Sequence, residues 1–238
     1  MPQRPRYGTW LVGLALALLG VLLLAACSPA GGEPSLGAAM SSSPDVSTIV
    51  SKARTASYID LTYTLEGEIQ AISSSGQDTT TGEGQITTKP KRVHFVQHTT
   101  LTSGKVVTQE GIGDEATQTL FAKTAFSGQP TPTQWTKLSA SDGQLVSASP
   151  PTIAALSHVQ LVGPDTVVGV AVWHLMGTMD VSGTHFAVDY YVYQNTYLPA
   201  KIHTISSGQI VGETTILVMK FNTGLTIDLP SAGQVLGD

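Results

Sequence analysis

The alternation of apolar and polar side chains is the feature that most constrains how this chain of 238 residues can fold. Between residues 59 and 69, nearly every odd position is apolar and every even position is polar, the pattern of a strand with one buried and one solvated face. Further strand candidates lie at 80–88, 92–101, 105–111, 117–123, 166–170, 172–180, 184–194, 198–206 and 209–221, with shorter pieces at Trp135 and near Ile227. Turn signals such as Ser75-Gly76, Ser103-Gly104 and Ser207-Gly208 separate many of them. The spacing predicts about ten strands in an antiparallel meander.

Two segments have helical spacing instead. Residues 45–56 place apolar side chains at positions i, i+3, i+4 and i+7, and Asp45 stands where a helix cap is expected. A second helix is predicted after Pro150-Pro151, with Ile153, Leu156 and Val159 on one side. The predicted fold class is therefore α+β: a large curved antiparallel sheet, or half-barrel, with a few helices packed on one side.

The first 27 residues have the pattern of an export signal. Arg4 and Arg6 precede an apolar run at 10–24, and the run ends in Leu24-Ala25-Ala26-Cys27. The run is about 15 residues long, shorter than the roughly 20 that a membrane-spanning helix needs. Cys27 is the only cysteine in the chain, so it has no partner for an intramolecular disulfide. These features predict a signal peptide at 1–26 that is removed before Cys27; the alternatives are an incidental cysteine or an uncleaved anchor helix.

Composition limits what the rest of the chain can bind. Residues 28–44 are rich in Ser, Gly, Ala and Pro and are expected to form a flexible tether, followed by one domain at 45–230 and a C-terminal tail at 231–238. The chain has 12 Lys and Arg against 17 Asp and Glu, with no basic cluster, which argues against a nucleic-acid partner. Charged residues are only 12% of the chain, and Thr, Ser, Gly and Val, which suit strands and polar turns, are frequent instead.

The histidines, serines and glycines do not have the spacing of a catalytic or metal site. His94 and His98 lie four residues apart on an expected strand, about 13 Å, too far for joint metal binding. The chain has no Gly-x-Ser-x-Gly elbow, and Ser182 lies beside an expected turn. Gly82-x-Gly84 lacks the context of a dinucleotide site, and Gly111-Ile112-Gly113 is interpreted as a turn or bulge. We therefore expect no enzyme activity, no metal and no cofactor.

The order of motifs along the chain carries a family resemblance. Leu24-Ala25-Ala26-Cys27 has the form of a lipobox, and the segments after it are the helix at 45–56, the strand at 59–69, Gly82-Glu83-Gly84-Gln85-Ile86 leading to Lys89-Pro90, Trp135-Thr136-Lys137, and a late hairpin containing Tyr197-Leu198-Pro199. This order resembles the mycobacterial lipid-binding lipoproteins of the LppX/LprG type and, through them, the LolA-like fold. The resemblance extends over residues 45–229 and rests on strand patterns and turn residues.

The resemblance implies both a location and a function. It implies that Cys27 carries lipid and holds a monomeric domain at the extracytoplasmic face of the cell membrane. It also implies that the half-barrel encloses an apolar cavity that carries or retains a lipid, a glycolipid or the acyl chains of a lipoprotein. The apolar strand faces, including the odd positions of 209–221, supply the candidate cavity residues Leu61, Tyr63, Leu65, Val188, Tyr190, Leu217 and Met219. For any single one of these residues, a place in an ordinary filled core is the favoured alternative. An envelope sensor or protein-interaction module on the same fold, and an exported hydrolase, remain as alternatives.

Overall fold

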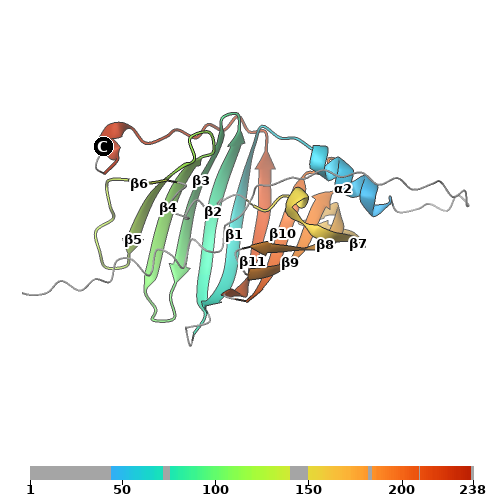
Figure 1. Ribbon diagram of the computed structural model, residues 1–238, viewed down its shortest axis with the longest axis horizontal. Helices are drawn as coiled ribbons and strands as arrows, with labels where there is room; N and C mark the ends of the chain where they lie inside the picture. Colours follow the sequence, from blue (N-terminus) through green and yellow to red (C-terminus); the bar gives the residue numbers. More distant parts are fainter. Residues whose placement is uncertain (1–43, 72–75, 140–149, 182–183, 209, 237–238) are drawn as a thin grey trace, which may run out of the picture.

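The computed structural model describes residues 44–71, 76–139, 150–181, 184–208 and 210–236. Eleven strands in this part form one open antiparallel sheet, in the order β6-β5-β4-β3-β2-β1-β11-β10-β9-β8-β7 (Figure 1). Their bounds are β1 Asp60–Ala71, β2 Asp78–Thr88, β3 Lys91–Thr100, β4 Val106–Asp114, β5 Thr119–Phe126, β6 Thr136–Ser139, β7 Ser157–Val167, β8 Val170–Val181, β9 Thr184–Tyr193, β10 Pro199–Gly208 and β11 Ile210–Phe221. The predicted signal peptide, Cys27 and all of the predicted tether except Pro44 lie outside the described residues.

Two meanders meet in the middle of the sheet. Strands β1 to β6 pair in sequence order, and so do β7 to β11. The last strand of the second meander, β11, then pairs antiparallel with β1. The predicted antiparallel meander is thus confirmed as two joined meanders, with eleven strands where about ten were expected, and β6 and β7 are the free edges.

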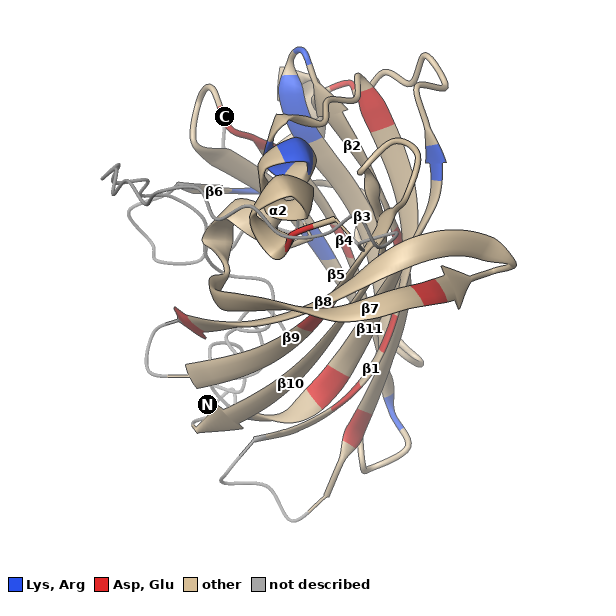
Figure 2. Cartoon of the chain, turned by 90° about the vertical axis from the view of Figure 1, so that its right-hand side faces the viewer, with Lys and Arg blue, Asp and Glu red and all other residues tan. Residues whose placement is uncertain are grey.

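One α-helix, α2 at Val46–Thr55, packs on one face of the sheet. It begins after Asp45 as predicted, and its Ile49 side chain is completely buried. Val46, Val50 and Ala53 pack beside Ile49 on the same core, as their helical spacing predicts. We name the face that α2 covers the inner face and the opposite one the outer face; Figure 2 shows the sheet curving around α2.

The predicted second helix is wrong. A single 3-10 turn, η2 at Ile153–Ala155, follows the two prolines, and the chain then enters β7. A helix of this length is marginal on its own, whereas pairing with β8 bonds the backbone of the segment along a whole strand. The described part of the chain therefore has one α-helix rather than a few, and a second 3-10 turn, η3 at Ala232–Gln234, lies near its C-terminal end.

The inner face holds the main core. In β9, the buried positions alternate without exception from Thr184 to Val192, as expected for a strand with one buried face. Side chains from both meanders meet under α2 and η2; the buried members of this core are Ile49, Leu61, Tyr63, Leu65, Ile86, Ile153, Leu156, Leu175, Phe186, Val188, Tyr190, Val192, Ile202, Ile216 and Val218. Burial of this shared apolar surface holds the two meanders and α2 together.

The segment after β11 is fastened across the ends of the strands (Figure 1). The carboxylate of Asp60 is fully buried and accepts hydrogen bonds from the backbone N–H groups of Thr223 (2.8 Å), Gly224 (2.9 Å) and Leu225 (3.2 Å), and from the Thr223 hydroxyl. Burial by itself raises the pKa of Asp60, but these hydrogen bonds hold the pKa below its usual value. An ionised Asp60 therefore fixes the point at which the chain leaves the sheet.

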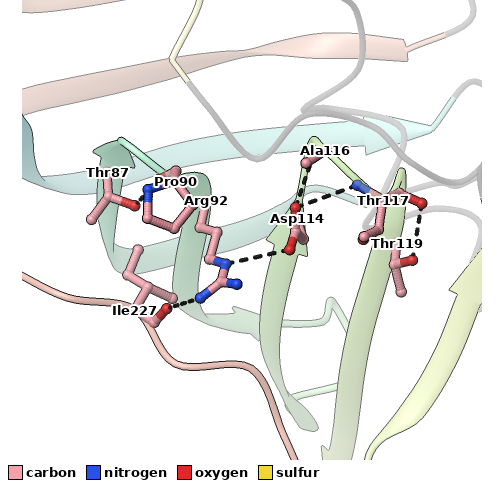
Figure 3. A network of polar contacts seen from close by, with 8 residues as sticks. All are labelled: Thr87, Pro90, Arg92, Asp114, Ala116, Thr117, Thr119 and Ile227. Carbon is pink, nitrogen blue, oxygen red and sulfur yellow. Dashed lines mark hydrogen bonds and ion pairs between the residues drawn. The ribbon is translucent and has the colours of Figure 1, made fainter.

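A second anchor holds the same segment further along (Figure 3). Arg92 Nη1 donates to the carbonyl oxygen of Ile227 at 2.8 Å, and Arg92 Nε donates to Asp114 Oδ2 at 3.3 Å. The other oxygen of Asp114 accepts from the N–H of Ala116 at 2.9 Å, in the turn after β4. Ile227, predicted as part of a last strand, therefore lies outside the described strands; it packs with Trp135 and Val235 in a second, smaller core.

Candidate functional site

Five of the seven predicted cavity residues lie together on the inner face. Leu61, Tyr63 and Leu65 come from β1, and Val188 and Tyr190 from β9. All five are at most 8% exposed and belong to the core beneath α2 and η2. The structure therefore brings them together, and β11 and β10 lie between the two strands that carry them.

The other two predicted residues, Leu217 and Met219, do not share this face. In β11 the buried inner side chains are Ile216 and Val218, whereas Leu217 packs in a cluster with Val167 and Met219 is 54% exposed. Regular pairing with β1 places Ile216 and Val218 on the inner face and Leu217 on the outer face. A β-bulge follows: Tyr63 pairs with Val218 and the preceding Thr62 pairs with Lys220, so Met219 is an extra residue in β11. The inward positions are therefore even up to Val218, and only beyond the bulge does an odd position, Phe221 opposite Leu61, face inward. The expectation that odd positions of this strand form one buried face is wrong.

Two aromatic rings lie flat on the inner face because glycines stand beneath them. A Cβ built on Gly84 of β2 would lie 2.1 Å from Cζ of Tyr63, and one on Gly111 of β4 would lie 2.3 Å from Cε1 of Phe95. Any side chain at either glycine would lift the ring above it. The rings therefore extend along the sheet and not upward from it, and Phe95 is only half-buried.

These glycines correct one interpretation of the sequence. Gly111 and Gly113, expected at a turn or bulge, lie within regular β4 and pair in register with β3 and β5. Phe95 and the two glycines under the rings were not among the predicted site residues. The available signal was the occurrence of glycine inside strand-like segments, which marks close approach of another group.

The middle of the inner face, from β1 to β5, carries no charged side chain. Four rows of cross-strand neighbours run across it: Leu61-Ile86-Val93-Gly113-Leu120, Tyr63-Gly84-Phe95-Gly111-Ala122, Leu65-Gly82-Gln97-Gln109-Thr124 and Gly67-Thr80-Thr99-Val107-Phe126. The first two rows are apolar. The third and fourth add neutral polar groups, among them the buried pair Thr80 and Thr99, whose hydroxyls lie 3.1 Å apart. Such groups can contact an uncharged ligand without the cost of removing a charged side chain from water.

The two buried tyrosines keep their protons. Burial raises the pKa of Tyr63 well above its usual value. Burial also raises the pKa of Tyr190; a charge on Tyr58 would raise it further, and a hydrogen bond with the backbone of Ile153 opposes the shift. Both phenols are therefore neutral across the physiological pH range, and η2 is joined to the sheet through Tyr190.

One buried donor near this core has no acceptor. Trp173 of β8 packs against the main core, and its Nε1 is inaccessible to solvent and makes no hydrogen bond with any residue that the structure describes. It is the single buried side-chain nitrogen or oxygen of this kind within the described residues. An unmet buried donor costs about 1–3 kcal/mol, so a ligand or water that offers an oxygen there gains that amount.

A separate pocket of about 570 Å³ lies on the outer face. The tip of the β7–β8 hairpin forms one wall, and residues of β1, β2, β10 and β11 form the other. Its lining is Thr64, Leu65, Glu66, Thr81, Gly82, Thr166, Val167, Val168, Lys201, Thr215 and Leu217. Of the predicted cavity residues, Leu65 and Leu217 contribute to this pocket.

His94 and His98 lie on the outer side of the sheet and take separate partners. His94 contacts Glu110 at 3.1 Å, and His98 contacts the Thr108 hydroxyl at 3.0 Å. Within the described ranges, no group of three or more His, Cys, Asp or Glu side chains is placed to hold a metal ion. The same ranges contain no helix long and apolar enough to span a membrane.

Comparison with known proteins identifies the fold. No protein-family model and no curated protein matches the sequence. The crystal structure of the lipoprotein LppX from Mycobacterium tuberculosis superposes with a TM-score of 0.51 and 12% identity, covering 77% of this chain and 100% of LppX. The chain has the LppX fold. The predicted resemblance to LppX/LprG-type lipoproteins is thus confirmed for the fold.

Two further solved structures are similar to this LppX-like chain. LprF from Mycobacterium bovis matches with a TM-score of 0.47 and 12% identity, over 78% of this chain and 96% of LprF. An outer-membrane lipoprotein-sorting domain from Vibrio parahaemolyticus matches with a TM-score of 0.31 and 9% identity, over 75% of this chain and 93% of that domain.

Proposed function

We propose that this chain is a lipid-anchored, extracytoplasmic binding protein that holds the acyl chains of a lipid, a glycolipid or a lipoprotein against the inner face of its sheet. The proposal includes carriage or retention of that cargo in the cell envelope, without catalysis. The observation that carries it is the uncharged middle of the inner face, with aromatic rings lying flat on glycines. The LppX fold and the resemblance to lipid-binding lipoproteins agree with it.

Acyl chains need no more than such a surface. Each CH₂ group that leaves water contributes about 0.8 kcal/mol, so length of contact alone gives affinity. Leu61, Tyr63, Leu65, Val188 and Tyr190 form the apolar core from which the cargo site extends. Phe95, half-buried on the same face, is the residue that we expect the chains to contact most directly.

Trp173 offers the one specific contact for a polar part of the cargo. Its buried Nε1–H lacks an acceptor, and the carbonyl of an acyl ester, or a hydroxyl, has the required lone pair. Such a contact would favour ester-linked chains over pure hydrocarbon. In this proposal, the contact with Trp173 sets the register of the cargo along the inner face.

Cys27 supplies the membrane attachment in this proposal. Residues 28–43 separate it from Pro44, and an extended chain of that length spans at most roughly 55 Å. One acyl chain binds a membrane only marginally, whereas two or more bind it stably. The proposal therefore requires a diacylated or triacylated Cys27.

Native mass spectrometry of the mature chain, produced without lipidation as the Cys27→Ser variant, tests the cargo directly. We expect a bound mass that solvent extraction identifies as a lipid or glycolipid, or binding of such lipids when they are added to an empty chain. A chain that stays empty after incubation with phospholipids, glycolipids and acylated peptides would contradict the proposal. That result would favour the protein-interaction module on the same fold.

A further inference from the structure

The turn between β7 and β8 exposes valine in an unfavourable backbone conformation. Val168 and Gly169 connect the two strands, with φ angles of 49° and 77°. Positive φ at both positions is the requirement of a type I′ turn, for which Asn-Gly is the preferred sequence. A β-branched residue rarely adopts positive φ because its side chain crowds the backbone. Valine at this position is therefore unfavourable for the turn itself.

Nothing in the fold offsets that strain at Val168. Its side chain is 81% exposed, and Val170, the next valine along the chain, is 46% exposed. Only Val167 is buried; it packs with Val172 and Ala200 and fixes the hairpin to the outer face. The tip is thus held in place with its valines toward solvent, and Figure 2 shows it projecting past the side of the sheet opposite to α2.

The charges around the tip narrow the choice of partner. The pocket that Val168 lines also contains one cation, Lys201, and one anion, Glu66, and Asp165 lies three residues before Val168, so the tip has no surplus of positive charge. Electrostatic attraction to anionic headgroups or to an acidic protein therefore cannot hold this surface. An apolar environment can hold this surface, because the transfer of valine side chains out of water is favourable whatever the charge of the surface.

We propose that the tip of the β7–β8 hairpin inserts its valines into a lipid bilayer and gives the domain a second membrane contact. The inference rests on the lipid anchor of the proposed function. Anchoring keeps the domain within the length of its tether, at a high effective concentration of lipid, so a weak contact suffices. The anchor then supplies residence at the membrane, and the hairpin fixes the orientation of the domain.

A single fluorescent probe can report the contact in the anchored protein. Lipidation consumes the thiol of Cys27, so Val170→Cys introduces the only free thiol and can be labelled with an environment-sensitive dye. On phosphatidylcholine vesicles, we expect the probe to lose its quenching by iodide relative to the unlipidated Cys27→Ser chain in buffer. A matched probe at Val211→Cys, 47% exposed on the outer side of β11, should remain quenched in both states.

Val168→Asn separates insertion from folding. Asparagine tolerates positive φ, so the melting temperature should not fall, while iodide quenching of the probe at position 170 should return. Quenching on vesicles equal to that in buffer, protection that survives Val168→Asn, or a lower melting temperature would overturn the inference. The cargo measurement is independent: an empty chain with a protected probe contradicts only the cargo, and a loaded chain without protection contradicts only the hairpin contact.

Discussion

A methyl group added at Gly111 tests whether the space above Phe95 belongs to a cargo. The Cβ of Gly111→Ala would lie 2.3 Å from both Cε1 and Cζ of Phe95, so the ring must leave the sheet. Because Phe95 is only half-buried, we expect the ring to swing into the space over the inner face. The perturbation thus fills the proposed site with the protein's own side chain.

The size of the effect follows from the volume that the ring occupies. A displaced ring excludes about four methylene groups of an acyl chain. Binding is then weaker by about 3 kcal/mol, or roughly a hundredfold in affinity. Stability should change little. Alanine is better than glycine within a strand by about 0.5–1 kcal/mol, which offsets a similar cost of moving the ring. The melting temperature should therefore shift by less than about 3 °C.

Gly84→Ala is the matched control. Its Cβ would lie 2.1 Å from the ring of Tyr63, which is 3% exposed and has no open space to enter. Overpacking of this kind costs about 1–3 kcal/mol, a fall of roughly 2–10 °C in melting temperature. Displacement of a fluorescent fatty acid measures affinity, and thermal unfolding measures stability. Wild-type affinity in Gly111→Ala, or a loss of stability equal to that of Gly84→Ala, would refute the reasoning.

Three further changes test other parts of the account. Asp60→Asn should lower the stability of the fold at neutral pH. Because the pKa of Asp60 is lower in the folded chain than in the unfolded chain, the wild-type chain should be the more stable one above about pH 4. In unfolding curves measured at successively lower pH, this difference should vanish. Cys27→Ser should abolish incorporation of a fatty-acid probe in cells, and persistent labelling would exclude the anchor. Trp173→Phe should weaken binding of ester-linked lipids about tenfold and leave ether-linked lipids unaffected, whereas equal losses for both would exclude the hydrogen bond.

The strands could be predicted because one face of each is buried. In β1 and β9 the apolar residues alternate with polar ones, so the sequence indicates both the element and its inner face; Tyr63 and Val188 were placed correctly. Alternation does not identify the inner face where apolar residues are contiguous. Residues 216–219 of β11 are all apolar, so only the pairing of β11 with β1, with its bulge at Met219, decides which of them face inward.

Tertiary pairing explains the other failures. The segment after Pro151 has apolar residues at a spacing that suits a helix, but β8 offers it a partner strand, and that partner is invisible from local sequence. Gly111 looked like a turn residue because the ring that lies on it, Phe95, belongs to the neighbouring strand. In both cases the deciding contact joins residues distant in the chain, which local periodicity cannot report.

Quenching of tryptophan by brominated acyl chains tests the cargo site most directly. The proposed mature chain, which begins at Cys27, contains two tryptophans, Trp173 at the inner core and Trp135 in the smaller core that includes the C-terminal segment. The account predicts that lipids brominated along the acyl chain quench Trp173 in the Trp135→Phe variant and leave Trp135 unquenched in the Trp173→Phe variant. Equal quenching of both, or quenching of Trp135 alone, would contradict binding at the inner face.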